Sequence, residues 1–128
     1  MPGDYRNVVA WQKAYQACIA TYQATRSFPS EEQYGLTNQL RRAAVSVPSN
    51  IAEGYGRGTT GDYLRFLRMA AGSLAELRTQ VMLSRDLGLG RSEELTSLLM
   101  AADEVSNVLK GLIRSIQRKL ADDPKSNH

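Results

Sequence analysis

Residues 40–57 read LRRAAVSVPSNIAEGYGR, and this stretch decides the predicted fold. Ala43, Val47 and Ile51 fall on one side of a helical wheel at about 100° per residue, which indicates an amphipathic helix. Pro48 lies inside that pattern, where a proline removes one backbone hydrogen bond and costs roughly 3 kcal/mol. We therefore expect a helix that is kinked at Pro48.

A polar stripe runs beside the apolar side of this helix. It consists of Gln39, Arg42, Ser46, Asn50 and Glu53. We expect Glu53 and Glu76 to be partly buried because their neighbours are apolar, and a buried acid needs a partner. The prediction is a hydrogen-bonded network that fixes register or oligomeric state, in preference to an active site. Its members are Arg42, Ser46, Asn50, Glu53 and Glu76.

The sequence to either side predicts three further helices. They are expected over residues 8–26, 60–87 and 92–121, with the helix of the opening stretch at about residues 31–55. Pro29 interrupts the chain after the first helix, and Ser30, Thr59 and Ser92 are the predicted N-terminal caps of the next three. Because the connections are short, neighbouring helices are expected to be antiparallel.

Each predicted helix has an apolar side whose residues recur every three or four positions. In the first helix this side consists of Val8, Trp11, Tyr15, Cys18, Tyr22 and Thr25. In the third it consists of Tyr63, Leu67, Ala70, Leu74, Leu77 and Val81, and in the fourth of Leu95, Leu98, Ala102, Val105, Leu109, Leu112 and Ile116. Four such helices predict an all-α, up-down-up-down antiparallel four-helix bundle. A single domain is expected at residues 1–121, followed by a disordered tail at 122–128.

Residue types that catalysis often needs are scarce. His128, the one histidine, falls in the predicted tail, and Cys18, the one cysteine, falls on an apolar helix side where we expect it to pack in the core. The Glu-x-x-His pairs of di-iron bundles do not occur, and no predicted strand precedes the glycines of residues 54–61. We therefore predict no catalytic residue, no metal site, no cofactor and no enzyme activity.

Charge and hydropathy limit the function only weakly. A net charge of +3 and a pI near 9.2 are compatible with nucleic-acid binding and are also common in proteins that bind none. No apolar run approaches the roughly 18 residues of a membrane span, and the first residues lack the order of a signal peptide. The expectation is a cytoplasmic protein without membrane association.

Seven cations are expected at one end of the bundle, around the turn between the second and third helices and the end of the fourth. They are Arg41, Arg57, Arg65, Arg68, Arg114, Arg118 and Lys119. Arginines beside Tyr55 and Tyr63 suit phosphate contact combined with base stacking, so this end is a predicted surface for RNA or DNA. The alternative is a solvated rim balanced by acids such as Asp62 and Asp122.

The third helix has a second surface away from its apolar side. Met69, Gly72, Ser73 and Leu83 fall there. Small and apolar residues on an outward face let another helix approach closely, which favours contact between copies of this chain.

Five segments of the chain resemble a known family. They are WQKA (11–14), FP (28–29), YGLT (34–37), QLRRAAVSVPSNIAEG (39–54) and GSLAEL (72–77), in that order and spacing. In these segments the chain resembles the bacterial four-helix-bundle proteins encoded in 23S ribosomal RNA intervening sequences. The resemblance implies a homopentamer and a distant kinship with the accessory variability proteins of diversity-generating retroelements, which bind nucleic acid and a reverse transcriptase. It implies no catalytic residue at any position.

Three functional hypotheses follow from these observations. The first is a non-enzymatic homo-oligomer that acts as a nucleic-acid-associated accessory protein through its basic end. The second is a protein-interaction scaffold without a nucleic-acid role. The third is an enzyme whose site lies at subunit junctions around Arg42, Asn50, Glu53 and Glu76.

Overall fold

A computed structural model, which describes residues 3–123, consists of four long α-helices. They are α1 (Val9–Thr25), α2 (Leu36–Tyr55), α3 (Thr60–Asp86) and α4 (Ser92–Asp122), with short 3-10 turns at Tyr5–Asn7 and Ser30–Glu32. The described range contains no strand, so the predicted all-α four-helix fold is confirmed. The predicted tail begins inside α4 at Asp122, and residues 124–128, with His128, lie outside the described residues.

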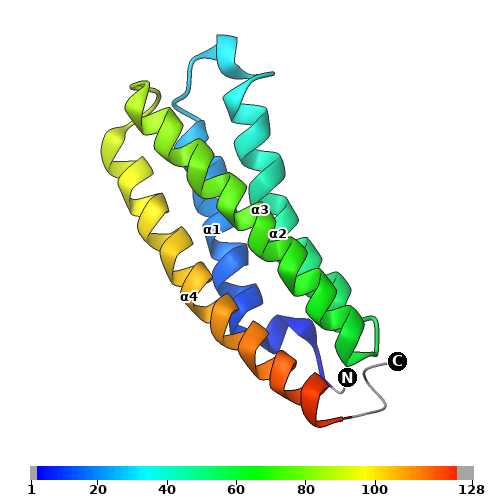
Figure 1. The fold of residues 1–128 in the computed structure, drawn as a ribbon. Coiled ribbons are helices and arrows are strands. Elements are labelled where there is room, and N and C mark those ends of the chain that lie inside the picture. The colour runs from blue at the N-terminus through cyan, green and yellow to red at the C-terminus, as the bar shows by residue number, and fades with distance from the viewer. Residues whose placement is uncertain (1–2, 124–128) are drawn as a thin grey trace.

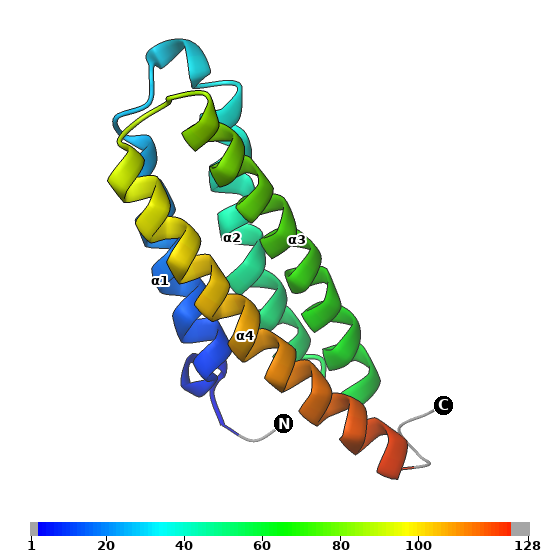
Figure 2. The ribbon, with the colours of Figure 1, turned by 60° about the vertical axis from the view of Figure 1, so that its left-hand side comes forward.

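The four helices lie side by side, and each runs opposite to its neighbour in the chain (Figures 1 and 2). Each of α1 and α3 contacts both α2 and α4, and the contact between α2 and α3 is the most extensive. Helix α2 continues through Pro48 from Leu36 to Tyr55 as one helix, and the kink expected there remains a prediction. The turn between α2 and α3, the start of α1 and the end of α4 therefore share one end of the bundle.

The apolar sides predicted for α3 and α4 do form the core. All six residues predicted for α3 are buried, as are six of the seven predicted for α4. Leu112 is the seventh, and it packs half-buried against the same cluster. Each long heptad-like pattern therefore identified the correct helix side, since only one side of these helices is rich in large aliphatic residues.

The side predicted for α1 is correct only in part, since Thr25 is buried and Val8, Trp11 and Cys18 pack partly buried against the core. The residues that α1 buries are Ala10, Ala14, Ala17, Thr21, Ala24 and Thr25, whereas Tyr15 and Tyr22 are exposed. Alanine and threonine recur in α1 with the same helical period as the aromatic residues, and their small side chains let α1 lie close to its neighbours. The buried Thr21 hydroxyl donates to the Ala17 carbonyl at 2.8 Å, so it needs no partner from another helix.

Two predicted helix starts also differ from the structure. Ser30 opens a 3-10 turn rather than α2, and α2 begins at Leu36, whose backbone N–H donates to the Glu32 carboxylate. Ser92 is the first residue of α4 and not its cap, since Arg91 holds the cap position without a side-chain hydrogen bond. The cap of α3 is as predicted, because the Thr59 hydroxyl accepts from the Asp62 backbone N–H.

A glycine sets the distance between α2 and α3 near their shared turn. A β-carbon placed on Gly54 would lie 2.6 Å from Phe66 Cβ and 3.3 Å from the Tyr63 carbonyl oxygen. No real β-carbon approaches another atom as closely as the first distance, so only glycine lets the helices meet here. This contact holds Phe66 and Tyr63 against the end of α2.

Candidate functional site

The structure brings six of the seven predicted cations to one end of the bundle and leaves Arg41 at the other. Arg41 lies in the second turn of α2, about 24 Å along the helix direction from Arg57 at 1.5 Å per residue. Its guanidinium donates to the Thr25 hydroxyl at 2.9 Å and lies 4.6 Å from the Tyr22 ring centroid. The prediction that Arg41 belongs to the basic cluster is therefore wrong, because most of the length of α2 separates Arg41 from Arg57.

Two cations of this end are already engaged with acids and with Phe66. Arg57 pairs with Glu53 at 3.0 Å, and Arg65 approaches Asp62 at 3.6 Å. Their guanidinium carbons lie 4.9 and 4.6 Å from the centroid of the Phe66 ring. Because their charges are compensated, Arg57 and Arg65 contribute less to the attraction of an anion than sequence alone suggests.

The other four cations form what we call the basic end, made of Arg68, Arg114, Arg118 and Lys119. All four are exposed, and none has an ion-pair partner within residues 3–123. Leu120 of α4 lines the same shallow depression as Leu64 and Arg68 of α3, so the last turns of α4 lie beside the first turns of α3. Figure 1 shows the first turns of α3 and the last turns of α4 at the same end of the bundle, and the four residues come from these parts of the two helices.

The two tyrosines predicted beside these cations differ in accessibility. Tyr63 is buried in the core, and its ring meets the ring of Tyr55 edge to face at 5.8 Å. Burial, with a smaller contribution from Tyr55, raises the pKa of Tyr63 to about 12. A buried ring cannot stack on a nucleobase, so the part of the prediction that used Tyr63 for stacking is wrong.

The polar stripe of α2 is only partly the predicted network. Asn50 donates from its amide nitrogen to the Ser46 carbonyl oxygen at 2.8 Å and to the Ser46 hydroxyl at 3.0 Å. The Ser46 hydroxyl lies 2.8 Å from that of Ser73, which links α2 to α3. These three residues form a continuous polar contact across the two helices.

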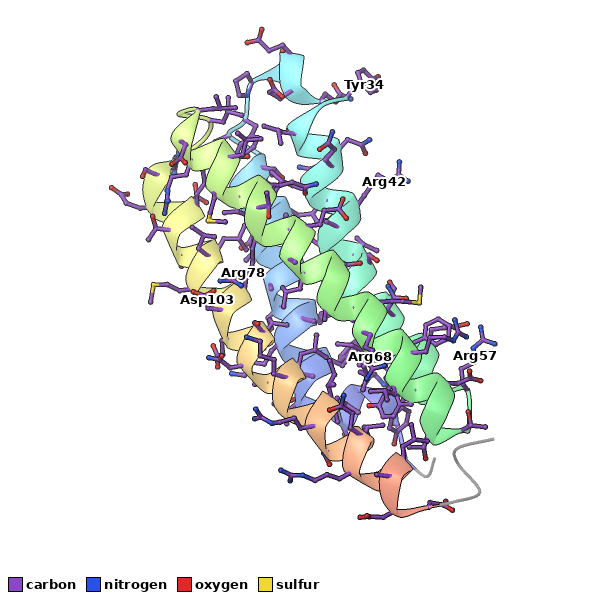
Figure 3. All side chains as sticks on the ribbon, in the orientation of Figure 1. Tyr34, Arg42, Arg57, Arg68, Arg78 and Asp103 are labelled. Atoms are coloured by element: carbon purple, nitrogen blue, oxygen red, sulfur yellow. The ribbon has the colours of Figure 1, made fainter. Side chains whose placement is uncertain are left out.

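The charged members of the stripe do not join this contact. Glu53 and Glu76 are exposed rather than partly buried, since both carboxylates lie on the outer side of their helices. Glu53 pairs with Arg57, and Glu76 accepts from the Gln80 amide at 3.3 Å. Arg42 points away from the bundle (Figure 3) and has no ion pair among the described side chains. The expected compensation of Glu53 by Arg42 is therefore absent.

Sequence reasoning missed a surface that we call the aromatic groove. It lies between α1 and α2 and is lined by Tyr5, Trp11, Tyr15, Cys18, Val45, Pro48, Ser49 and Ala52. A second depression continues it past Tyr22, Arg41 and Arg42. The sequence signal for this surface was the periodic set of alanines in α1. A helix with one periodic side of small residues and one of aromatic residues can bury the side of small residues and expose the aromatic side.

The aromatic rings of the groove pack on one another. Trp11 stacks on Tyr15 with ring centroids 4.9 Å apart, and Tyr5 meets Trp11 edge to face at 5.3 Å. Tyr15 nevertheless remains 48% exposed and Val45 41% exposed. Burial raises the pKa of the half-buried Cys18 thiol, which keeps it protonated and weakly nucleophilic. The groove is thus an apolar and aromatic surface rather than a reactive centre.

Within the part of the chain that is described, no three His, Cys, Asp or Glu residues come together as metal ligands. None of the helices between residues 3 and 123 has the length and apolar character of a membrane-spanning segment.

The fold and these surfaces define a small four-helix-bundle protein with a basic end and an aromatic groove. It belongs to the 23S rRNA-intervening sequence protein family, whose model matches residues 6–111. A crystal structure of a protein of unknown function from the S23 ribosomal protein family of Bacteroides thetaiotaomicron has the same fold, with a TM-score of 0.72. The identity is 17%, and the match covers 81% of this chain and 97% of that one. No curated protein matches the sequence.

Proposed function

We propose that this protein is a non-enzymatic, homo-oligomeric accessory protein that binds nucleic acid through its basic end. The observation that carries the proposal is a group of four exposed cations that have no acidic partner among residues 3–123, Arg68, Arg114, Arg118 and Lys119. Phosphate groups attract such side chains more strongly than cations that are already paired. Copies arranged side by side would present several basic ends to one strand, which raises the overall affinity.

The polar residues considered for an enzyme site favour a structural role. Ser46, Asn50 and Ser73 donate to and accept from one another, which occupies much of their hydrogen-bonding capacity. Glu53 is held by Arg57. A site at a subunit junction would need these groups to face a substrate, and their present contacts link helices of one chain instead.

Binding is tested with a fluorescently labelled single-stranded RNA and a DNA duplex, by anisotropy over a series of salt concentrations. Phosphate contacts release counterions, so we expect the association constant to fall steeply with salt, with a logarithmic slope of about −0.7 to −0.9 for each contact. No binding at the lowest salt concentration would refute the nucleic-acid role.

The variant Arg114→Gln with Arg118→Gln removes from the basic end two charges that have no ion-pair partner among residues 3–123. We expect it to weaken binding about tenfold or more at low salt and to reduce the salt slope by about two contacts. The matched control is Arg26→Gln with Arg91→Gln, which removes the same net charge from the opposite end of the bundle. Equal losses in both variants would indicate attraction to overall charge, and the basic end would not be the binding site.

The assembly is tested by light scattering on the purified protein. The protomer has a mass of 14.2 kDa, so the homopentamer implied by the resemblance corresponds to about 71 kDa. A monomer across the micromolar range would refute the homo-oligomer.

The aromatic groove favours a second candidate function, a protein-interaction scaffold, because aromatic residues and arginine are enriched at the centre of protein interfaces. An assembled protein that binds neither RNA nor DNA would support this alternative.

A further inference from the structure

We propose that the aromatic groove of one copy receives the outer side of α3 from the next copy, so that unlike surfaces meet and the assembly closes as a ring. This inference rests on the homo-oligomer of the proposed function and specifies which two surfaces form its interface. The outer side of α3, which we call the α3 ridge, consists of Met69, Gly72, Glu76 and Leu83, with Leu87 just past the helix end.

The groove has the composition of a protein interface. Tyr15, Ile19, Tyr22 and Val45 are each about two-fifths or more exposed, although they are large and apolar or aromatic. Single exposed residues of this kind are ordinary, but Tyr15, Tyr22 and Val45 come from two neighbouring helices and line adjoining depressions. Their number indicates a surface that is covered in the assembled protein.

The α3 ridge has a shape that fits this groove. Met69 and Leu83 are 47% and 46% exposed, and Gly72 between them has no atom within 4 Å of the place where a β-carbon would be. A glycine between two long apolar side chains leaves a notch into which an aromatic ring can fit. The ridge from Met69 to Leu83 is about 21 Å long, and the groove together with the depression that continues it, from Trp11 to Tyr22, is about 17 Å long, so the two are similar in length.

Charges on the two surfaces are complementary. Arg41 and Arg42 line the depression that continues the groove, and neither forms an ion pair with any described acid. Glu76 lies in the middle of the ridge and is exposed, and the Gln80 amide is its one partner in the described part of the chain. An arginine of one copy can therefore meet Glu76 of the next, which orients the contact.

Nucleic acid fits the groove less well than a second copy does. Base stacking needs open ring faces, but Trp11 and Tyr15 cover one face of each other and Arg41 covers a face of Tyr22. Val45, Pro48 and Ala52 add an aliphatic side that contacts apolar side chains favourably and phosphate unfavourably. These features favour the apolar ridge of another protomer.

The two surfaces come from different elements, since the groove lies between α1 and α2 and the ridge lies on the outer side of α3, which does not contact α1. When the groove of one copy binds the ridge of another, the pair still has one free groove and one free ridge. Further copies can therefore add head to tail until the ring closes. A contact between two like grooves would instead stop at a dimer.

The test uses two double variants, each of which disables one surface. Tyr15→Glu with Val45→Glu disables the groove, and Met69→Glu with Leu83→Glu disables the ridge. The matched control is Tyr34→Glu with Met100→Glu, which changes two exposed residues outside both surfaces, at 88% and 69% exposure. Light scattering gives the mass of each protein alone and of the two variants mixed, and circular dichroism reports helix content.

We expect each disabled variant to be a monomer of about 14 kDa and the control to keep the wild-type mass. Mixing the two variants should restore one contact and give a heterodimer of about 28 kDa, because one partner supplies a groove and the other a ridge. Glutamine replaces glutamate at the same positions in any double variant that has lost its helix content.

Three results would overturn the inference. They are a disabled variant that keeps the wild-type mass, a ridge variant that dimerises through its grooves, and a mixture of the two variants that remains monomeric. Each of these observations contradicts the pairing of unlike surfaces. A groove variant of unchanged mass that no longer binds RNA would assign the groove to nucleic acid instead. A monomeric wild-type protein refutes the homo-oligomer itself, whereas an assembled wild type with unaffected variants refutes this interface alone.

Discussion

Replacing Gly54 with alanine tests the close approach of α2 and α3 directly. The added β-carbon would lie 2.6 Å from Phe66 Cβ, 3.2 Å from Tyr63 Cδ1 and 3.3 Å from the Tyr63 carbonyl oxygen. Two of these atoms are a β-carbon and a backbone oxygen, which cannot move unless α3 moves with them. The helices must therefore separate by several tenths of an ångström around a buried aromatic pair.

The expected cost combines two opposing effects. Overpacking of a well-packed contact typically costs 1–3 kcal/mol, while alanine in place of glycine stabilises a helix by roughly 0.5–1 kcal/mol. The net prediction for Gly54→Ala is a free energy of unfolding that is lower by about 1–2 kcal/mol. For a chain of this length that corresponds to a Tm about 4–8 °C lower.

Urea unfolding followed by circular dichroism measures this difference, and Gly111→Ala is the matched control. Gly111 also lies within a helix, but a β-carbon there meets no atom within 4 Å, so the substitution should raise the stability by roughly 0.5–1 kcal/mol. If Gly54→Ala is as stable as Gly111→Ala, the two helices do not approach as closely as described and the reasoning fails.

Two further predictions concern other parts of the bundle. The pKa of Tyr63 rises from 10.0 to about 12 on folding, so the unfolded chain loses this proton at a lower pH than the folded chain does. The free energy of unfolding should therefore fall by about 1.4 kcal/mol per pH unit between these two pKa values. Tyr63→Phe should reduce that fall in urea titrations at pH 9.5 and 11, and an unchanged pH dependence would contradict the assignment. Gly90 has a φ of +64° and its β-carbon would lie 2.7 Å from Phe28 Cε1, whereas Gly88 has a φ of +73° and open space. Both alanine variants should lose about 1–2 kcal/mol to backbone strain, with a further loss only for Gly90→Ala; equal thermal shifts would show that the ring moves aside freely.

The sequence predicted the fold and two of the helix sides well, for a physical reason. In α3 and α4 the large aliphatic residues occupy a single side, so periodicity and hydrophobicity agree. In α1 they disagree, since Trp11 and Tyr15 have larger side chains than Ala14 and Ala17, yet Trp11 is only partly buried and Tyr15 is exposed. Which of two periodic sides is buried depends on how closely the neighbouring helices approach, and that distance is a property of the whole bundle.

The candidate site was harder to predict than the fold. The position of Arg41, far from Arg57, could have been predicted from the number of residues between them and the rise per residue of a helix. The pairing of Glu53 with Arg57 also follows from their spacing of four residues. The link between Ser46 and Ser73 does not, because it depends on the register of two helices that only tertiary packing fixes.

The shared location of the start of α1, the end of α4 and the turn between α2 and α3 has a practical consequence for labelling (Figure 1). The start of α1 and the end of α4 lie at the end of the bundle that carries Arg114 and Arg118, so a charged tag joined to the chain before α1 or after α4 would compete with the oligonucleotide there. The turn between α3 and α4, at the opposite pole, offers an attachment point that leaves those arginines uncovered.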